Sequence, residues 1–165
     1  MQRTVIAVVD ATRARLFTYE RAAEVGGIEE KLSERFDLVN PARHRTPAQL
    51  FSDTRTNTSR TGGKLYGLDD HRDAHMDAMD SEFASAVASA IEQAVRDTNA
   101  KRVIVCASPR MLGILRTTDL RRGGVVLDEV AHDYSKMSPH QLHDVLVERG
   151  LLPASPRRAA LAARI

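Results

Sequence analysis

Acidic residues are the first candidates for chemistry in this 165-residue sequence. Asp10 directly follows an apolar run, and later carboxylates that could join it are Asp80 or Glu82 and Asp128 or Asp133. Carboxylates that converge can hold two divalent metal ions and support phosphodiester cleavage. With 22 acidic residues in the chain, such matches also arise by coincidence, and Asp is equally a favourable turn residue. A metal-dependent nuclease is therefore an alternative that depends on geometry.

Two histidines give a second candidate, a zinc site. His71 and His75 are four residues apart and Glu82 follows seven residues later, so in a helix the three lie along one flank. Histidines at this spacing can bind zinc, but a site needs a further protein ligand and shielding from solvent. No Glu follows His71, so the hydrolytic His-Glu-x-x-His motif is absent. A solvated helix entrance is the alternative, and no cofactor is expected.

A polar, cationic segment is the third candidate. Residues 52–64, SDTRTNTSRTGGK, contain no apolar side chain. Between positions 41 and 64, five basic residues stand against a single acid, so this stretch carries +4 whereas the whole chain carries +2. Arg55, Arg60 and Lys64, among Thr and Ser hydroxyls, suit contacts with phosphate oxygens. A solvated segment that binds nothing specific is the alternative interpretation.

Hydrophobic periodicity predicts the elements that must position these residues. Thr4–Val9 and Ala14–Tyr19 are apolar runs joined by a short polar connection, which predicts an antiparallel hairpin. Lys31–Val39 alternates apolar and polar residues and predicts an edge strand. Residues 41–70, rich in Pro and Gly, predict a long basic loop. Loops of this length are usually functional or disordered.

Helices and strands alternate in the rest of the chain. Apolar residues recur at three- and four-residue steps from about Asp73 to Asn99, which predicts one long helix. Strands are expected at Lys101–Ala107 and Val125–Ala131. Ser108-Pro109 and Ser138-Pro139 are N-cap and first-turn pairs that should begin two further helices.

The order β-β-β-α-β-α-β-α predicts one α/β domain over residues 1–165, with a mixed five-stranded sheet, helices on its faces and a tail at 151–165. This succession is the plan of ribonuclease-H-like folds and of the middle domain of archaeal and eukaryotic class-1 peptide release factors. Cys106 lies in an apolar run and is expected to be a buried, unpaired thiol. Without a membrane-spanning run or a secretory leader, a cytoplasmic location and no membrane partner are expected.

Four segments resemble the bacterial host-attachment-protein family, which is named for a proposed role in attachment to host cells. They are VVDATRARLFTYE, HMDAMDSEFASAVASAIEQAV, RVIVCASPRMLGILR and EVAHDYSKMSPHQLHDVL. The most specific parts are the D-x-x-x-A-R-L-F hairpin, the S-P-R-x-L-G-x-L-R unit and the K-x-S-P-x-x-L run. The family usually carries a loop of the D-R-P-G-R kind before the long helix, whereas SDTRTNTSRTGG stands here and lacks that proline.

The host-attachment family is in turn similar to the release-factor middle domain, whose catalytic Gly-Gly-Gln lies on a basic loop before a long helix. Gly62 and Gly63 occupy the comparable place, with Lys64 where the glutamine would be. Because that glutamine positions the hydrolytic water, peptidyl-tRNA hydrolysis by this mechanism is not expected. The resemblance and the local charge predict a non-enzymatic protein that binds RNA or a ribosomal partner through residues 52–66. A protein-interaction module that affects adhesion is the remaining alternative.

Overall fold

The computed structural model describes residues 1–44, 66–120 and 124–154, and of these the side chains of all but 44 and 66–72. Five strands form one mixed sheet in the order β3-β2-β1-β4-β5. Strand β1 (Gln2–Val9) is central, pairing antiparallel with β2 (Arg13–Glu24) and parallel with β4 (Arg102–Ala107). The edges are β3 (Gly27–Val39) and β5 (Val126–Ala131). The predicted mixed α/β sheet, with an edge strand at β3, is confirmed.

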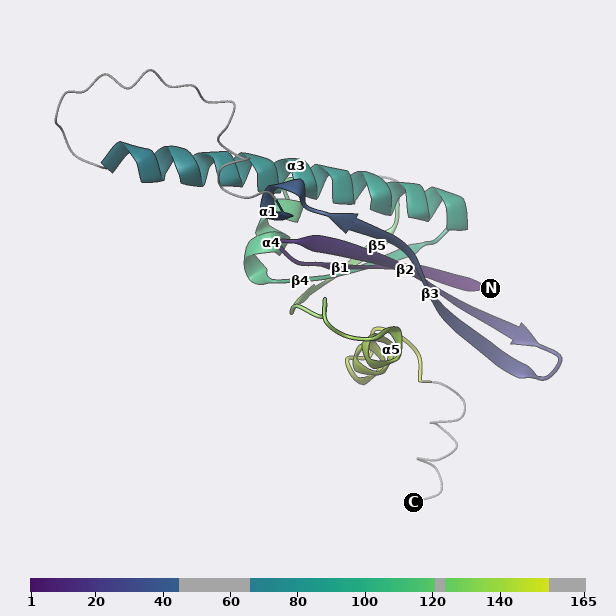
Figure 1. The fold of residues 1–165 in the computed structure, drawn as a ribbon. Coiled ribbons are helices and arrows are strands. Elements are labelled where there is room, and N and C mark those ends of the chain that lie inside the picture. Colours follow the sequence, from purple (N-terminus) through teal and green to yellow (C-terminus); the bar gives the residue numbers. More distant parts are fainter. Residues whose placement is uncertain (45–65, 121–123, 155–165) are drawn as a thin grey trace.

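Helices cover both faces of this sheet (Figure 1). They are α1 (Pro41–His44), α3 (Tyr66–Thr98), α4 (Pro109–Leu115) and α5 (Pro139–Glu148). The two predicted Ser-Pro starts are confirmed. The side-chain oxygen of Ser108 accepts a hydrogen bond from the backbone N–H of Met111, and Ser138 forms a capping box with Gln141.

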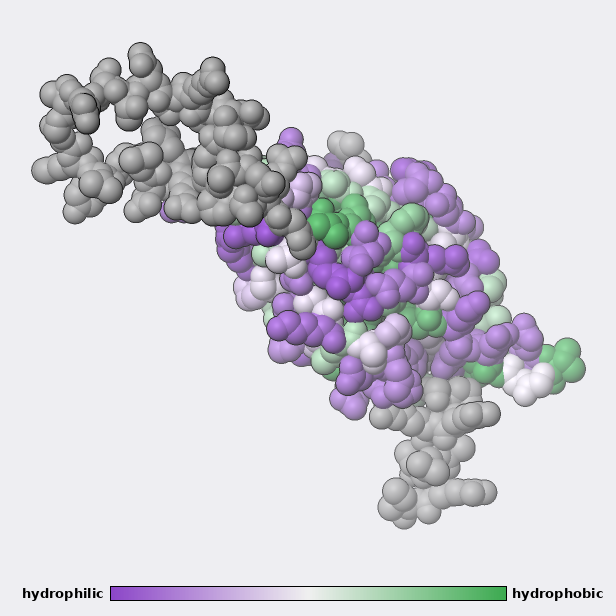
Figure 2. All heavy atoms as spheres, viewed as in Figure 1, coloured by the Kyte–Doolittle hydropathy of each residue, from purple (hydrophilic) through white to green (hydrophobic). Residues whose placement is uncertain are grey.

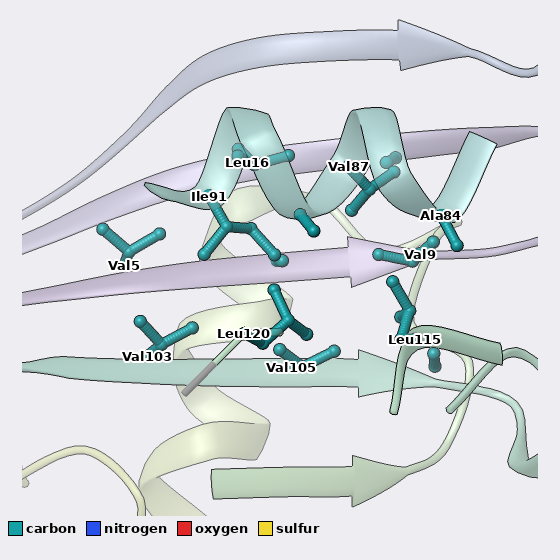
Figure 3. Packing of buried hydrophobic residues seen from close by; sticks show 14 of the residues in the cluster. Val5, Val9, Leu16, Ala84, Val87, Ile91, Val103, Val105, Leu115 and Leu120 are labelled. Atoms are coloured by element: carbon teal, nitrogen blue, oxygen red, sulfur yellow. The ribbon is translucent and has the colours of Figure 1, made fainter. Parts of the chain in front are cut away.

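Alternation along β1 divides the buried core into two layers. Val5, Ala7 and Val9 pack against α3 and α4 (Figure 3), whereas Ile6 and Val8 pack against α5. Because both faces of the central strands are covered, their sequences are continuously apolar. Cys106, on β4, is fully buried as expected, and that burial raises the pKa of its thiol to about 12. The thiol is therefore un-ionised at neutral pH and part of the core.

The expected limits of the second and third strands, Ala14–Tyr19 and Lys31–Val39, are wrong, because both strands are longer. Strand β2 continues to Glu24 and β3 begins at Gly27, beyond the last pairing of β2 with β1 at Arg21. The extension is an arm of two strands that pair only with each other, so it needs no apolar alternation. Val25, in the turn at its tip, is fully exposed, and Figure 2 shows hydrophobic surface at this end of the molecule, at the right.

The expected limits of the long loop and helix are also wrong. Pro41–His44 is a short helix, and α3 begins at Tyr66 rather than near Asp73. The first part of α3 extends past the end of the sheet (Figure 1), and residues 73–75 are exposed. The sequence of residues 66–75 carries no apolar stripe, which is why periodicity did not reveal the first turns of the helix. None of the helices described is long and apolar enough to cross a membrane.

Candidate functional site

Polar side chains gather where the parallel strands β1, β4 and β5 end. Asp10 follows β1, Ser108 follows β4, and residues 132–137 follow β5. The projecting part of α3 begins at this same end of the molecule (Figure 1). Ligands of α/β sheets bind outside the carboxyl ends of the strands, at the point where successive connections diverge. Here the chain leaves β1 for the antiparallel strand β2 and leaves β4 for α4. A ligand site is therefore expected at the carboxyl end of β1 and β4.

Asp10 closes the turn between β1 and β2. One of its carboxylate oxygens accepts hydrogen bonds from the Thr12 N–H (2.6 Å), the Thr12 hydroxyl (2.6 Å) and the Arg13 N–H (2.8 Å). Burial by itself would raise the pKa of Asp10, but hydrogen bonds from Thr12, Arg13 and Ser135 outweigh it and hold the pKa below its ordinary value. The ionised carboxylate is therefore built into the turn.

An open groove of about 900 Å³ lies beside this turn. It is lined by the turn itself, the facing parts of β2 and β3, and Ser135 and Lys136 after β5. Arg15 holds its inner wall: two guanidinium nitrogens donate to the Glu34 carboxylate (2.8 Å each), and a third donates to the carbonyls of Ser135 (3.2 Å) and Met137 (2.7 Å). The hydrogen bond from Arg15 lowers the pKa of Glu34. The inner wall is thus rigid and internally neutral.

The outer wall of the groove is more accessible. Arg13 donates to both oxygens of Asp37, at 3.2 and 2.5 Å, and these side chains are 41% and 47% exposed. Arg35 borders the groove at the strand edge, but its Nε donates to the Thr18 hydroxyl (3.1 Å), which lies on the α3 face of the sheet. Lys136 is exposed and makes no ion pair with any residue that the structure describes. Apart from Arg35, the groove has three cationic side chains and three carboxylates.

A second ionic cluster lies on the opposite side of the turn, around Asp80 of α3. This carboxylate is fully buried and accepts hydrogen bonds from the Asn40 side-chain amide (3.1 Å) and from Arg43 of α1 (3.0 Å). Arg110 of α4 completes the cluster at 3.3 Å. The Asn40 amide also donates to the carbonyl of Ala11 (2.9 Å), so the cluster joins the β1–β2 turn to three helices.

The other acids considered for a nuclease have separate environments. Glu82 is exposed on α3, and Asp128 pairs with Arg102 of β4 at 2.7 Å. Asp133 accepts a hydrogen bond from the Ser135 N–H at 2.8 Å. Within residues 1–44, 66–120 and 124–154, no group of three His, Cys, Asp or Glu side chains is arranged to hold a metal ion. Asp10 and Asp80 instead have the structural contacts given above.

The proposed zinc ligands all belong to α3: His71 and His75 are in its first part, and Glu82 follows further along the same helix. His75 and Glu82 are both exposed, and the side chain of His71 lies outside the described residues. The sequence-based alternative of a solvated helix entrance fits the exposure of His75 and Glu82.

The sequence also matches the model of a protein family over residues 5–146, and that family is described as "Protein required for attachment to host cells". The chain belongs to this family. Its description names attachment and no reaction. No curated protein matches the sequence.

Two solved structures similar to this host-attachment family member are Ppx/GppA proteins of Aquifex aeolicus, the first named as a phosphatase. The first has 11% sequence identity and a TM-score of 0.38, and the match covers 79% of this chain and 36% of that one. The second has 14% identity and a TM-score of 0.32, with coverages of 78% and 35%. The host-attachment chain thus spans about a third of the length of either protein.

The cationic segment of the host-attachment chain lies between α1 and α3. Its candidate residues Arg55, Arg60, Gly62, Gly63 and Lys64 fall outside the described residues. Helix α1 lies at the carboxyl end of β1, where Arg43 meets Asp80 of α3, and the first part of α3 extends past the sheet at this end (Figure 1). The segment is therefore attached at the same end of the sheet as the groove.

Sequence patterns did not reveal the two ionic clusters of the host-attachment chain. Asn40 and Arg43 are 40 and 37 residues from Asp80 along the chain, and no motif links them. The Arg15–Glu34 pair is also set by an irregularity: Arg15 lies opposite Asp37 and Phe17 opposite Glu34, with a register shift between Leu16 and Phe17. A regular register continued from Arg15 and Asp37 would not have predicted it.

Proposed function

We propose that this host-attachment family member is a non-enzymatic protein that binds RNA, free or in the ribosome, through the basic segment of residues 52–66. The observation that carries the proposal is a net charge of +4 between residues 41 and 64, immediately before a helix that extends past the sheet. A cationic segment attached to a projecting helix can approach a large polyanion without obstruction from the body of the protein.

The residue types in the segment favour contacts with the RNA backbone. Arg, Lys, Ser and Thr are the side chains that bind phosphate oxygens, and such contacts position a nucleic acid without reading its sequence. No aromatic residue stands between Ser52 and Tyr66, so base stacking contributes little there. Binding should therefore be tolerant of sequence and sensitive to salt.

The resemblance to the release-factor loop is a further argument for this proposal. Gly62 and Gly63 would allow the same close approach that the glycines of the release-factor loop allow. Lys64 in place of the glutamine supplies a charge instead of a group that positions water. The proposed role is therefore attachment to RNA without peptidyl-tRNA hydrolysis. The cytoplasmic location expected from the sequence stays a prediction, to be checked by cell fractionation.

Fluorescence anisotropy with labelled single-stranded RNA and with tRNA tests the proposal. With about three phosphate contacts to a single strand, affinity should fall about 20-fold between about 50 and about 200 mM salt. The variant Arg55→Ala/Arg60→Ala/Lys64→Ala should lose most of this salt dependence.

Arg96→Ala is the matched control, since Arg96 is 62% exposed near the other end of α3. Its binding should equal that of the wild type. The proposal would be contradicted by the absence of RNA binding at low salt. It would also be contradicted if the slope of log affinity against log salt were equal for the wild type and the triple variant.

A further inference from the structure

We propose that Asp80 and Arg43 are positioning residues for RNA binding, because they fix α1, from which the basic segment continues, against α3. This inference rests on the proposed function, since it assigns a role to side chains that do not contact the RNA themselves. The observation that carries it is that the last described element before the segment is held against α3 by one buried carboxylate.

Helix α1 (Pro41–His44) cannot hold its position by itself. With four residues it is a single turn, far below the length of about 12 residues at which isolated helices begin to be stable in water. Its position must therefore come from contacts with the rest of the protein. Ala42 is buried, and polar contacts on both sides of it fix the orientation of the turn.

Asn40 and Asp80 make these polar contacts. Asn40 caps α1: its side-chain oxygen accepts a hydrogen bond from the Ala42 N–H (3.1 Å), and its carbonyl oxygen accepts one from the Arg43 N–H (3.1 Å). The Asn40 amide donates to Oδ1 of Asp80 (3.1 Å), and the Arg43 guanidinium donates to Oδ2 (3.0 Å). The two oxygens of one carboxylate on α3 thus hold both the cap of α1 and a residue within it.

The Asp80 cluster is electrically neutral, which separates positioning from attraction. Arg110 of α4 pairs with Asp80 (3.3 Å) and with Asp77 (2.9 Å), so two arginines face two carboxylates. Arg43 counts toward the +4 of residues 41–64, but a phosphate could bind it only by displacing a fully buried acid. Because an unpaired buried carboxylate is costly, Arg43 stays with Asp80 when RNA binds.

Fixing α1 defines where both ends of the segment are attached to α3. Helix α1 lies beside α3 (Figure 1) and meets it at Asp80. The other end joins α3 at Tyr66, about 21 Å further along the helix at 1.5 Å per residue. RNA therefore meets a segment whose two ends already have defined positions. Since ordering a chain during binding costs affinity, this preorganisation strengthens binding without adding a contact.

The test compares RNA affinity and its salt dependence in Arg43→Met and Arg55→Ala, by fluorescence anisotropy on the full chain. In Arg43→Met the affinity should fall about five- to tenfold at every salt concentration, which corresponds to ordering the backbone of about one residue. The slope of log affinity against log salt should stay that of the wild type. Arg55→Ala, which removes a phosphate contact, should instead reduce the slope by about 0.7.

Two further variants separate positioning from a general loss of stability. Arg43→Lys keeps a charge opposite Asp80 and should recover part of the affinity. Arg102→Met is the matched control, since Arg102 is 28% exposed, as Arg43 is 29% exposed, and pairs with Asp128 at the opposite end of the sheet. It removes an equivalent ion pair without moving α1, so its affinity should equal that of the wild type.

Thermal melting shows whether each variant is folded. If Arg43→Met is not, the double variant Arg43→Met/Asp80→Asn, which leaves no unpaired carboxylate at position 80, should show the same loss of affinity at an unchanged slope. Hydrogen exchange without RNA gives an independent measurement. The amides of residues 42–44 should exchange faster in the variant than in the wild type, because α1 has lost its hold on α3.

Three results would overturn the inference. They are wild-type affinity in the folded variant, a slope reduced by about 0.7, which would make Arg43 a phosphate ligand, and unchanged exchange at residues 42–44. If one of these occurs while the triple segment variant loses its salt dependence, the positioning role fails and the proposed function stands. If the wild type binds no RNA, both fail.

Discussion

Two ionic clusters lie on opposite sides of the β1–β2 turn, and they differ in their access to water. On the α3 side, the Asp80 carboxylate is fully buried and is held by Asn40, Arg43 and Arg110. On the α5 side, the Arg13–Asp37 pair at the groove is nearly half exposed. Ion pairs of the same kind therefore have two roles. The buried cluster joins the β1–β2 turn to α1, α3 and α4, whereas the exposed Arg13–Asp37 pair is accessible to solvent and ligands.

This difference follows from electrostatics. A buried carboxylate has lost its hydration, so its protein partners are indispensable, and removing them leaves an uncompensated group in a medium of low dielectric constant. An exposed pair exchanges protein partners for water with little change in free energy. The comparison between the two clusters can therefore be tested by removing equivalent groups from each.

The largest effect should come from Asp80→Ala. The substitution leaves the buried Asn40 amide with one partner fewer and separates α1 and α4 from α3, so the free energy of unfolding should fall by about 2 to 4 kcal/mol. The matched variant Asp37→Ala should lose less than about 1 kcal/mol. Urea denaturation measures both, and equal losses would show that the two clusters do not differ as described.

Arg15→Lys should have an intermediate effect. A lysine cannot make the paired contacts with Glu34 while also donating to the carbonyls of Ser135 and Met137. We expect a loss of about 1 to 2 kcal/mol and faster amide hydrogen exchange confined to residues 132–138. Arg13→Lys should change neither the free energy of unfolding nor the amide exchange of residues 132–138 by a measurable amount. Unaltered exchange in Arg15→Lys would mean that Arg15 does not hold this segment.

The smallest effect concerns the pH dependence of Asp10. Its pKa is lower in the folded protein than the ordinary value of 3.8, so its contribution to stability is present above that value and is lost as the pH falls through the folded-state pKa. Asp10→Asn keeps an acceptor oxygen but cannot be protonated. Unfolding measured from pH 6 down to pH 3 should therefore show a smaller acid-induced loss for Asp10→Asn than for the wild type. Identical pH profiles would contradict this role of Asp10.

The sequence predicted the sheet because burial leaves a direct signal. The apolar runs around Val5 and Ile104 are typical of strands covered on both faces, and the Ser-Pro pairs mark helix starts through local hydrogen bonding. By contrast, the first part of α3 and the hairpin arm carry no regular apolar pattern in the sequence, so periodicity gave no information about them.

The candidate site was less predictable, because ion pairs depend on tertiary contacts. Asp80 was considered only as a nuclease carboxylate, since nothing near it in sequence reveals Asn40 or Arg110 as partners. Lys136 stands singly in the sequence and comes to border the groove with Arg13 and Arg15 only through the tertiary fold. The charge of residues 41–64, a local property, was evident from the sequence alone.

The central claim is that RNA binds at the carboxyl end of β1. Photo-crosslinking of the full chain to 4-thiouridine-labelled RNA, followed by mass spectrometry of the peptides, tests it most directly. Crosslinks should map to residues 52–66, and they should disappear as salt is raised. Crosslinks concentrated on the hairpin tip around Val25, or around Lys101 at the opposite end of the sheet, would contradict the account.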